Sequence, residues 1–315
     1  MEDKKKLKNM ALRIITVSLN RAMQLNTHLN SFYRNFNCSF NFEHFVIYGA
    51  TNEKFQEGYN NVMKQFPNVK FIKKDMGAHK RNYKYFLIYP RNIYWFIKYP
   101  FMRTKELFNF NEICRYLVES GPEFITFTTD DSYFYESFKV TETIFKKISE
   151  DPRKNFFGIW QGKNLNNCPK SIKKDGELLT WSTTCNDCDR YWKNRFSIDF
   201  NIYHKNPLLH MLRRIYFVTP NSLEGFGNFY ATKHGFFERG FSFEISPWVM
   251  FSLNQVQTDG NHMDTLVIDL NFLNDKFLEG YELFFEIFSP PKIIDSIADK
   301  VLLKNKESGD VIILK

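Results

Sequence analysis

The chain has 315 residues, enough for one large α/β domain or two small ones with a substantial buried core. Its 35 Phe and 16 Tyr residues are more rings than a core alone needs, and 43 Lys and Arg against 35 Asp and Glu give a formal charge of +8, which suits an anionic partner. No apolar run reaches the roughly 18 to 20 residues of a membrane span, and the 5 irregularly spaced cysteines do not form a disulfide framework.

The first part of the chain alternates short apolar runs with helical segments. Strands are predicted at Ile14 to Leu19, Phe45 to Tyr48 and Val69 to Ile72, with helices between them at Met23 to Phe36 and Asn52 to Phe66. This rhythm predicts a Rossmann-like, mostly parallel central sheet with helices on both faces. Ligands bind such sheets at the carboxyl ends of the strands, so we expect binding residues directly after each strand.

The start of the chain and one later segment bear on location. Met1 to Leu19 lacks the small-residue cleavage site of a secretory signal, so we expect a cytoplasmic protein. The segment from Tyr83 to Arg103 mixes rings and cations, as a membrane-contacting surface does, but Pro90 and Pro100 break any single amphipathic helix. We favour a structural insertion there and keep peripheral membrane contact as the alternative.

A fourth strand ends in two adjacent acids. A helix at Asn111 to Glu119 and a strand at Phe124 to Thr128 lead into Asp130 and Asp131. Because this strand end should open onto the ligand crevice, the pair is placed to hold Mg²⁺ or Mn²⁺ together with phosphate oxygens. The alternative is that Asp130 caps the following turn while Asp131 is solvated.

The second half of the chain is less regular. We expect a loop from Asn164 to Trp192, a strand at Phe196 to Tyr203 and a helix near Pro207 to Arg214. The loop holds cysteines with half of a zinc-ribbon spacing, and His204 or His210 would have to complete a zinc site. We favour reduced thiols without zinc for Cys168, Cys185 and Cys188.

Several of these segments, in their order and spacing, resemble the successive motifs of glycosyltransferase family 2. The resemblance covers roughly residues 11 to 135 and weakens afterwards. The segments that carry it are Ile14 to Arg21, Phe45 to Thr51, Gly77 with Arg81-Asn82, and Phe124 to Ser132.

The resemblance implies a GT-A fold, a nucleotide-sugar donor and a set of binding residues. The residues implied to bind the nucleotide are Ser18, Asn20, Arg21, Gly49, Arg81 and Asp130. A D-x-D-like element would hold Mn²⁺ or Mg²⁺ through Asp131 and Asp130. Two departures stand out: Gly49-Ala50-Thr51 replaces an Asp that often contacts the base, and the D-x-D element reads Thr129-Asp130-Asp131-Ser132.

The first-strand loop also supports this assignment from its own chemistry. Ser18, Asn20 and Arg21 supply a hydroxyl, an amide and a charged fork, which together can hold ribose and phosphate. Taken alone, Arg21 is better explained as a residue of a surface salt bridge. An inverting transferase needs a base near the acceptor, and Glu224 is our candidate because Pro220-Asn221-Ser222-Leu223-Glu224 resembles the acidic position of the family. Equally, Glu224 could complete a capping box begun by Asn221.

The leading hypothesis is a metal-dependent, inverting glycosyltransferase of surface polysaccharide or glycan synthesis. It would move a hexose from a nucleotide diphosphate, with a UDP-sugar favoured, to a saccharide or lipid-linked acceptor. Residues 1–135 would form the donor half of one GT-A domain, 136–290 the acceptor half and 291–315 a C-terminal tail. The alternatives are a sugar-nucleotide nucleotidyltransferase, although no glycine-rich loop follows the first strand, and a non-catalytic basic surface-binding protein. We expect no nucleic-acid partner, because paired acids repel phosphate unless a cation intervenes.

Overall fold

The structure, a computed structural model, describes residues 11–38, 40–74, 108–251, 253–254, 266–287 and 300–315. Arg81, Gly77 and the segment from Tyr83 to Arg103 lie outside these residues, so the expectations placed on them stay predictions. No helix in the described ranges is long and apolar enough to cross a bilayer.

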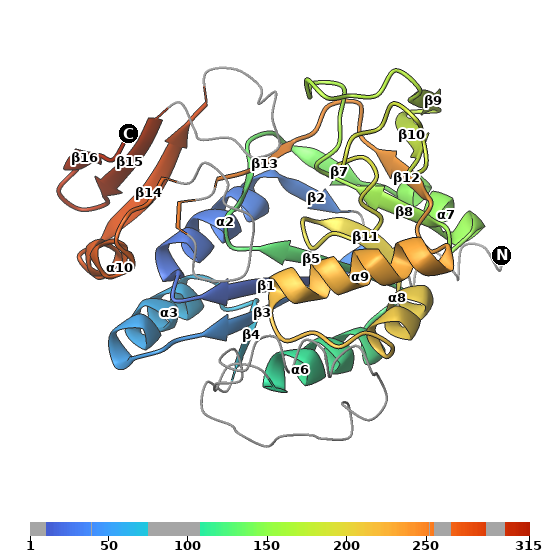
Figure 1. The fold of residues 1–315 in the computed structure, drawn as a ribbon. Helices are drawn as coiled ribbons and strands as arrows, with labels where there is room; N and C mark the ends of the chain where they lie inside the picture. Colours follow the sequence, from blue (N-terminus) through green and yellow to red (C-terminus); the bar gives the residue numbers. More distant parts are fainter. Residues whose placement is uncertain (1–10, 39, 75–107, 252, 255–265, 288–299) are drawn as a thin grey trace.

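The first half of the chain builds a parallel sheet, as the strand and helix rhythm predicts (Figure 1). Neighbouring strands β4, β3, β1 and β5 all run in one direction. Helices α2 and α3 pack together on one face of these strands, and α6 covers the other face, as right-handed crossovers require. The bounds are β1 Ala11–Leu19, α2 Ala22–Asn35, β3 Asn41–Gly49, α3 Glu53–Gln65, β4 Lys70–Lys73, α6 Phe108–Glu119 and β5 Phe124–Thr129.

The second half extends the same sheet to nine strands, in the order β4-β3-β1-β5-β11-β8-β12-β10-β9. Within it, β11 and β10 run against the direction of the other strands, so the fold is a mixed α/β fold with a mostly parallel central sheet. Helix α8 packs against α6, and α9 packs against α8 (Figure 1). The bounds are α7 Glu142–Glu150, β8 Asn155–Gly158, β9 Lys173–Asp175, β10 Leu178–Ser182, β11 Asn201–His204, α8 Lys205–Leu212, α9 Pro220–His234 and β12 Arg239–Ser242.

Two expectations for the second half were wrong. The strand predicted from Phe196 to Tyr203 begins at Asn201, because the buried run before it is a loop whose residue Phe200 has a φ of 60°. The predicted loop from Asn164 to Trp192 contains the strands β9 and β10. Apolar residues in a buried loop produce the same hydrophobic run as a strand, and the sequence pattern alone does not separate the two.

Three smaller sheets complete the fold. Strands β2 and β7 pair in parallel, β6 pairs with β13, and β14, β15 and β16 form an antiparallel sheet (Figure 1). The segment expected to be a C-terminal tail supplies β15 and β16, with Val301 and Leu303 fully buried. The bounds are β2 Phe36–Cys38, β6 Ser132–Phe134, β7 Phe138–Val140, β13 Trp248–Met250, α10 Leu270–Leu278, β14 Tyr281–Glu286, β15 Lys300–Asn305 and β16 Val311–Ile313.

The C-terminal sheet is seated on helix α2. Asn26 Nδ2 donates to Glu282 Oε1 at 2.8 Å, and Thr27 Oγ1 donates to the carbonyl oxygen of Leu283 at 3.2 Å. A shared apolar cluster joins α2, α3, α10 and β14 to β15. The helix therefore lies between the central sheet and the C-terminal sheet, and contacts both.

Candidate active site

Four side chains that the sequence nominates meet at the carboxyl ends of β1 and β5. Arg21 Nη1 lies 2.7 Å from Asp130 Oδ1 and 3.1 Å from Asp131 Oδ2. The hydroxyl of Ser18 donates to Asp130 Oδ2 at 2.7 Å. Because β1 and β5 are parallel neighbours, the residues that follow them necessarily share one edge of the sheet.

Burial dominates the electrostatics of this cluster. It raises the pKa of Asp130 to about 6; the Arg21 guanidinium opposes the shift, and the neighbouring Asp131 carboxylate adds to it. Burial also lowers the pKa of Arg21, but the attraction of the two carboxylates outweighs that effect and leaves it raised. The guanidinium therefore stays charged, and Asp130 holds its negative charge less easily than a solvated carboxylate.

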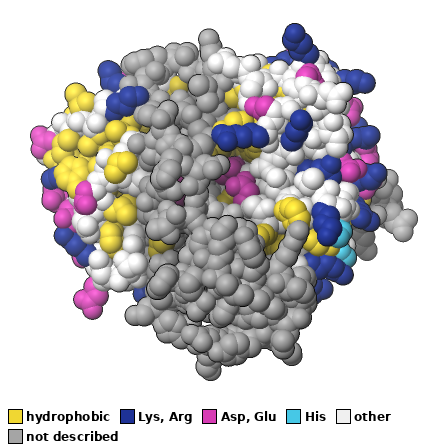
Figure 2. All heavy atoms as spheres, viewed as in Figure 1, with side chains coloured by type: hydrophobic (Ala, Val, Ile, Leu, Met, Phe, Trp, Pro, Cys, Tyr) yellow, Lys and Arg dark blue, Asp and Glu magenta, His cyan; other side chains and the backbone are white. Residues whose placement is uncertain are grey.

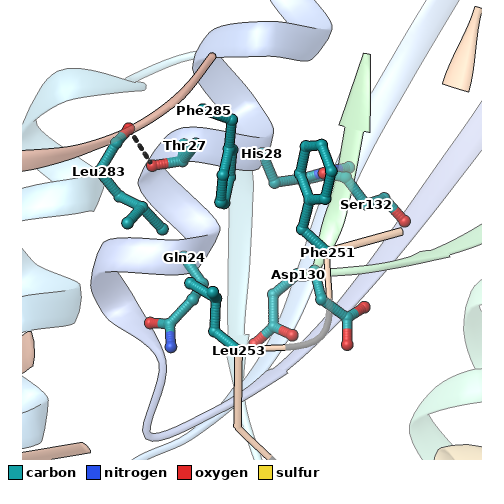
Figure 3. Close-up of a pocket in the computed structure, with 10 residues that line it drawn as sticks. Gln24, Thr27, His28, Asp130, Ser132, Phe251, Leu253, Leu283 and Phe285 are labelled. Carbon is teal, nitrogen blue, oxygen red and sulfur yellow. Dashed lines mark hydrogen bonds between the residues drawn. The ribbon is translucent and has the colours of Figure 1, made fainter. Parts of the chain in front are cut away.

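Helix α2 supports the acids from behind. His28 Nδ1 lies 2.9 Å from the carbonyl oxygen of Ser132, the residue that directly follows the acids. Burial lowers the pKa of His28 to about 4, so at neutral pH the ring is uncharged and its Nδ1–H donates to that carbonyl. Figure 3 shows one small pocket in which His28 lies between the rings of Phe251 and Phe285, with Gln24 and Asp130 beneath them.

The pocket matters because it has room for about one water-sized occupant beside unpartnered polar atoms. Asp131 Oδ1 and Gln24 Nε2 are buried and have no hydrogen-bond partner among the residues that the structure describes. A buried carboxylate oxygen without a donor is costly unless a cation or water approaches it. The donor set of two adjacent carboxylates therefore fits a hard divalent cation.

Arg21 forms a buried ion pair with both acids, and its Nη2 donates to the carbonyl oxygen of Asn254 at 2.6 Å. Its nomination as a nucleotide-binding residue stays a prediction. Neither of the sequence alternatives, a surface salt bridge for Arg21 or a turn-capping Asp130 beside a solvated Asp131, describes this arrangement. A cation bound by Asp130 and Asp131 would have to share these carboxylates with the guanidinium.

The loop after β1 is locked to the loop after β3. Asn20, whose φ is 55°, donates from Nδ2 to Thr51 Oγ1 at 2.9 Å and accepts from the backbone N–H of Thr51 at 2.9 Å. Its own N–H donates to the carbonyl oxygen of Gly49 at 3.0 Å. Asn20 and Gly49 thus lie together at the expected edge of the sheet. The hydrogen bonds of Asn20 given above join it to the loop after β3.

Glu224 lies on helix α9 rather than at its cap. The N-cap is Thr219, whose side chain accepts from the backbone N–H of Ser222. The Ser222 hydroxyl in turn accepts from the backbone N–H of Thr219, and Pro220 occupies the first turn of the helix. The alternative that Glu224 completes a capping box begun by Asn221 is therefore wrong. Glu224 is half-buried, and its Oε1 accepts from Asn194 Nδ2 at 3.4 Å.

One buried residue of this site was missed from sequence. The Tyr59 hydroxyl accepts from the backbone N–H of Arg21 at 3.1 Å and lies 2.7 Å from Ser18 Oγ. Since the Ser18 proton goes to Asp130, Tyr59 donates to Ser18. A single Tyr on the buried face of the predicted helix from Asn52 to Phe66 carries no local signal that separates this role from core packing.

The cysteines do not form the zinc site considered from their spacing. Cys185 and Cys188 are joined as a disulfide, so the expectation of reduced thiols is wrong for this pair. The described residues that could group around an ion there are Cys185, Asp187 and Cys188, without Cys168 or a histidine. Asp187 is already engaged by Ser171, whose hydroxyl donates to it at 2.5 Å.

Comparison with known proteins gives one sequence relative. No family profile matches the chain. The chain is 25% identical over 224 residues to the bifunctional glycosyltransferase pgtA of Dictyostelium discoideum, a match that covers 64% of this chain and 25% of that protein. The chain therefore spans about a quarter of the length of this relative. The relative is a glycosyltransferase, the class of enzyme that the resemblance of the motifs implies.

Two solved structures of S. aureus TarS are also similar at low level. One is 17% identical, covers 76% of this chain and 37% of that chain, and has a TM-score of 0.41. The other, of residues 1–349, is 17% identical, covers 75% of this chain and 58% of that chain, and has a TM-score of 0.38. At these scores the likeness adds nothing to the fold and site described above.

Proposed function

We propose that the chain is a metal-dependent, inverting glycosyltransferase that moves a hexose from a nucleotide diphosphate sugar to a saccharide or lipid-linked acceptor. The observation that carries the proposal is the buried acid pair at the end of β5, in which Asp131 Oδ1 has no described partner. The sequence relative is a glycosyltransferase, which favours sugar transfer over nucleotidyl transfer.

Each residue of the cluster has a chemical task in this proposal. Asp131, with Asp130, would hold Mn²⁺ or Mg²⁺, which supplies positive charge to the departing diphosphate. Ser18 and Tyr59 fix the Asp130 carboxylate through hydrogen bonds of 2.7 Å in series. Arg21 keeps its charge at every relevant pH and would contact phosphate oxygens once the acids turn to the metal. A carboxylate of the second half, for which the sequence nominates Glu224, would face the acceptor.

The proposal predicts a metal-dependent ligand response. UDP-, GDP-, dTDP- and CMP-sugars are screened by thermal shift with and without Mn²⁺, because a ligand that binds the folded state alone raises the unfolding temperature. We expect one nucleotide to stabilise the protein when Mn²⁺ is present, and Asp131→Ala to abolish that shift. Asp187→Asn, at an exposed carboxylate away from the cluster, is the control and should keep it. If no donor shifts the wild type, the glycosyltransferase proposal fails.

A further inference from the structure

Strand β11 brings an acid that the motifs do not include to the same edge as the acid pair. Because β11 runs antiparallel to β5, its first residues lie beside the last residues of β5. The backbone N–H of Phe200 donates to the carbonyl oxygen of Phe127 at 2.7 Å. Asp199, one residue earlier, is therefore next to the end of β5 that continues into Asp130.

The backbone is bent just before β11 begins. Phe200 is fully buried and has a φ of 60°, a left-handed conformation that costs a residue with a side chain about 1 kcal/mol or more. Ser197 holds the Asp199 carboxylate in place, since its hydroxyl donates to Asp199 Oδ2 at 2.8 Å and accepts from the Asp199 N–H at 3.2 Å.

A second carboxylate reaches the same loop from helix α9, since Glu224 Oε1 accepts from Asn194 Nδ2 at 3.4 Å. Burial raises the pKa of the Tyr203 hydroxyl, and the Glu224 and Asp199 carboxylates add to the shift. Figure 2 shows a small group of Asp and Glu side chains near the middle of this face, beside the residues drawn in grey. Asp199 and Glu224 are each half-buried.

An unpartnered amide lies in the same group. Asn201 is fully buried, and its Nδ2 donates to the Tyr203 hydroxyl at 3.1 Å. Its Oδ1 is buried and has no hydrogen-bond partner within the described part of the chain. Such an orphaned acceptor is expected to receive a donor from a buried water. Asp199 and Glu224 are the half-buried members of this group, so they are the side chains that a sugar hydroxyl can reach.

We propose that Asp199 is a catalytic residue, the carboxylate that takes the proton of the acceptor hydroxyl, while Glu224 binds a further acceptor hydroxyl. This rests on the proposed function. The acceptor oxygen forms its bond to the anomeric carbon of the donor sugar as the bond from that carbon to the phosphate oxygen breaks. The electron pair of the broken bond leaves with the nucleotide, and the acceptor proton goes to an oxygen of Asp199.

The choice of Asp199 over Glu224 follows from position. Asp199 lies in the loop that leads into β11, the strand next to β5, beside the residues that lead into the acid pair, whereas Glu224 is on helix α9. A base must reach the reacting hydroxyl while the donor phosphate is held at the metal acids. The acid nearer to the end of β5 meets that condition.

The test compares Asp199→Asn with Glu224→Gln and a matched control. Asp187→Asn makes the same chemical change at a carboxylate that also accepts from a serine hydroxyl, that of Ser171, outside the site. Turnover is measured as nucleotide release from the donor found by the thermal-shift screen, with p-nitrophenyl glycosides as acceptors. Mn²⁺-dependent donor binding and the unfolding temperature are measured for each variant.

We expect Asp199→Asn to lower kcat by about 10² to 10⁴-fold, the usual contribution of a general base, with donor binding and unfolding temperature unchanged. Glu224→Gln should mainly raise the acceptor KM, and Asp187→Asn should match the wild type. The inference is overturned if kcat of Asp199→Asn stays within about threefold of the control. If Asp199→Asn unfolds, Asp199→Ser is judged by the same limits. A wild type that binds no donor overturns the proposed function, whereas a transferring wild type with an active Asp199→Asn overturns this inference alone.

Discussion

Replacing Arg21 by Met tests the description of the buried ion pair. The guanidinium makes three short contacts, to Asp130 at 2.7 Å, Asp131 at 3.1 Å and the Asn254 carbonyl oxygen at 2.6 Å. Arg21 and Asp130 are 8% and 5% exposed, so water cannot replace the lost partner. Removing one member of a buried pair leaves an uncompensated charge, and we expect Arg21→Met to lower the free energy of unfolding by about 3–5 kcal/mol near neutral pH.

The loss should depend on pH with a definite sign. The folded-state pKa of Asp130 is raised to about 6, so the folded protein binds this proton more tightly than the unfolded chain does. Stability from this group is therefore highest at low pH and falls as pH rises towards the folded pKa. Arg21→Met removes the opposing attraction and raises that pKa further, so the fall continues above pH 6 and the difference from wild type is larger at about pH 8 than at about pH 5.

The assay is urea unfolding followed by circular dichroism at both pH values, with the free energy extrapolated to water. The double variant Arg21→Met, Asp130→Asn is the control. It leaves one fewer buried charge without a partner and should recover about half of the loss or more. A loss below about 1 kcal/mol, or a loss that is greater at the lower pH, would refute the reasoning.

Three further predictions use the same measurement of unfolding free energy. Gly227→Ala places a Cβ 2.4 Å from Cδ1 of Phe196 and should cost about 1–3 kcal/mol, whereas Gly225→Ala, in the same helix but facing open space, should gain up to about 1 kcal/mol; equal effects at the two sites would contradict the packing of α9. Thr219→Ala removes the N-cap acceptor of α9 and should cost about 1 kcal/mol, and no change would show that the cap contributes nothing. Ser18→Ala removes a 2.7 Å hydrogen bond to a buried carboxylate and should cost about 2 kcal/mol, with a neutral effect counting against an ionised acceptor.

The parts of the fold that were predicted from sequence are those that local patterns decide. The β-branched run from Ile14 to Leu19 can be buried on both faces only as a central strand, and the structure confirms it as β1. The acids after Phe124 to Thr128 follow from the end of that strand. Their meeting with Ser18 was expected because parallel neighbours share an edge.

The parts that were missed depend on distant contacts. Asp199 lies inside an apolar run that predicts a strand, and the left-handed Phe200 that ends this loop has no local signal because it is not glycine. The ion pair of Arg21 arises because burial removes competing water, which composition does not reveal. Helix α9 carries Gly225, Gly227 and several rings, so its pattern resembles a loop until Thr219 and Pro220 are seen to start it.

The packing of the C-terminal sheet against α2 has a consequence for truncated forms of this chain. Helix α2 is hydrogen-bonded to that sheet through Asn26 and Thr27, and the next residue, His28, is hydrogen-bonded to the carbonyl oxygen of Ser132 beside the acid pair. Trimming β15 and β16 would strip β14 of its pairing and loosen the helix beneath it. Damage would then surface at the carboxylates, although none of the deleted atoms lies beside them, and such a product could be mistaken for one with a chemical defect.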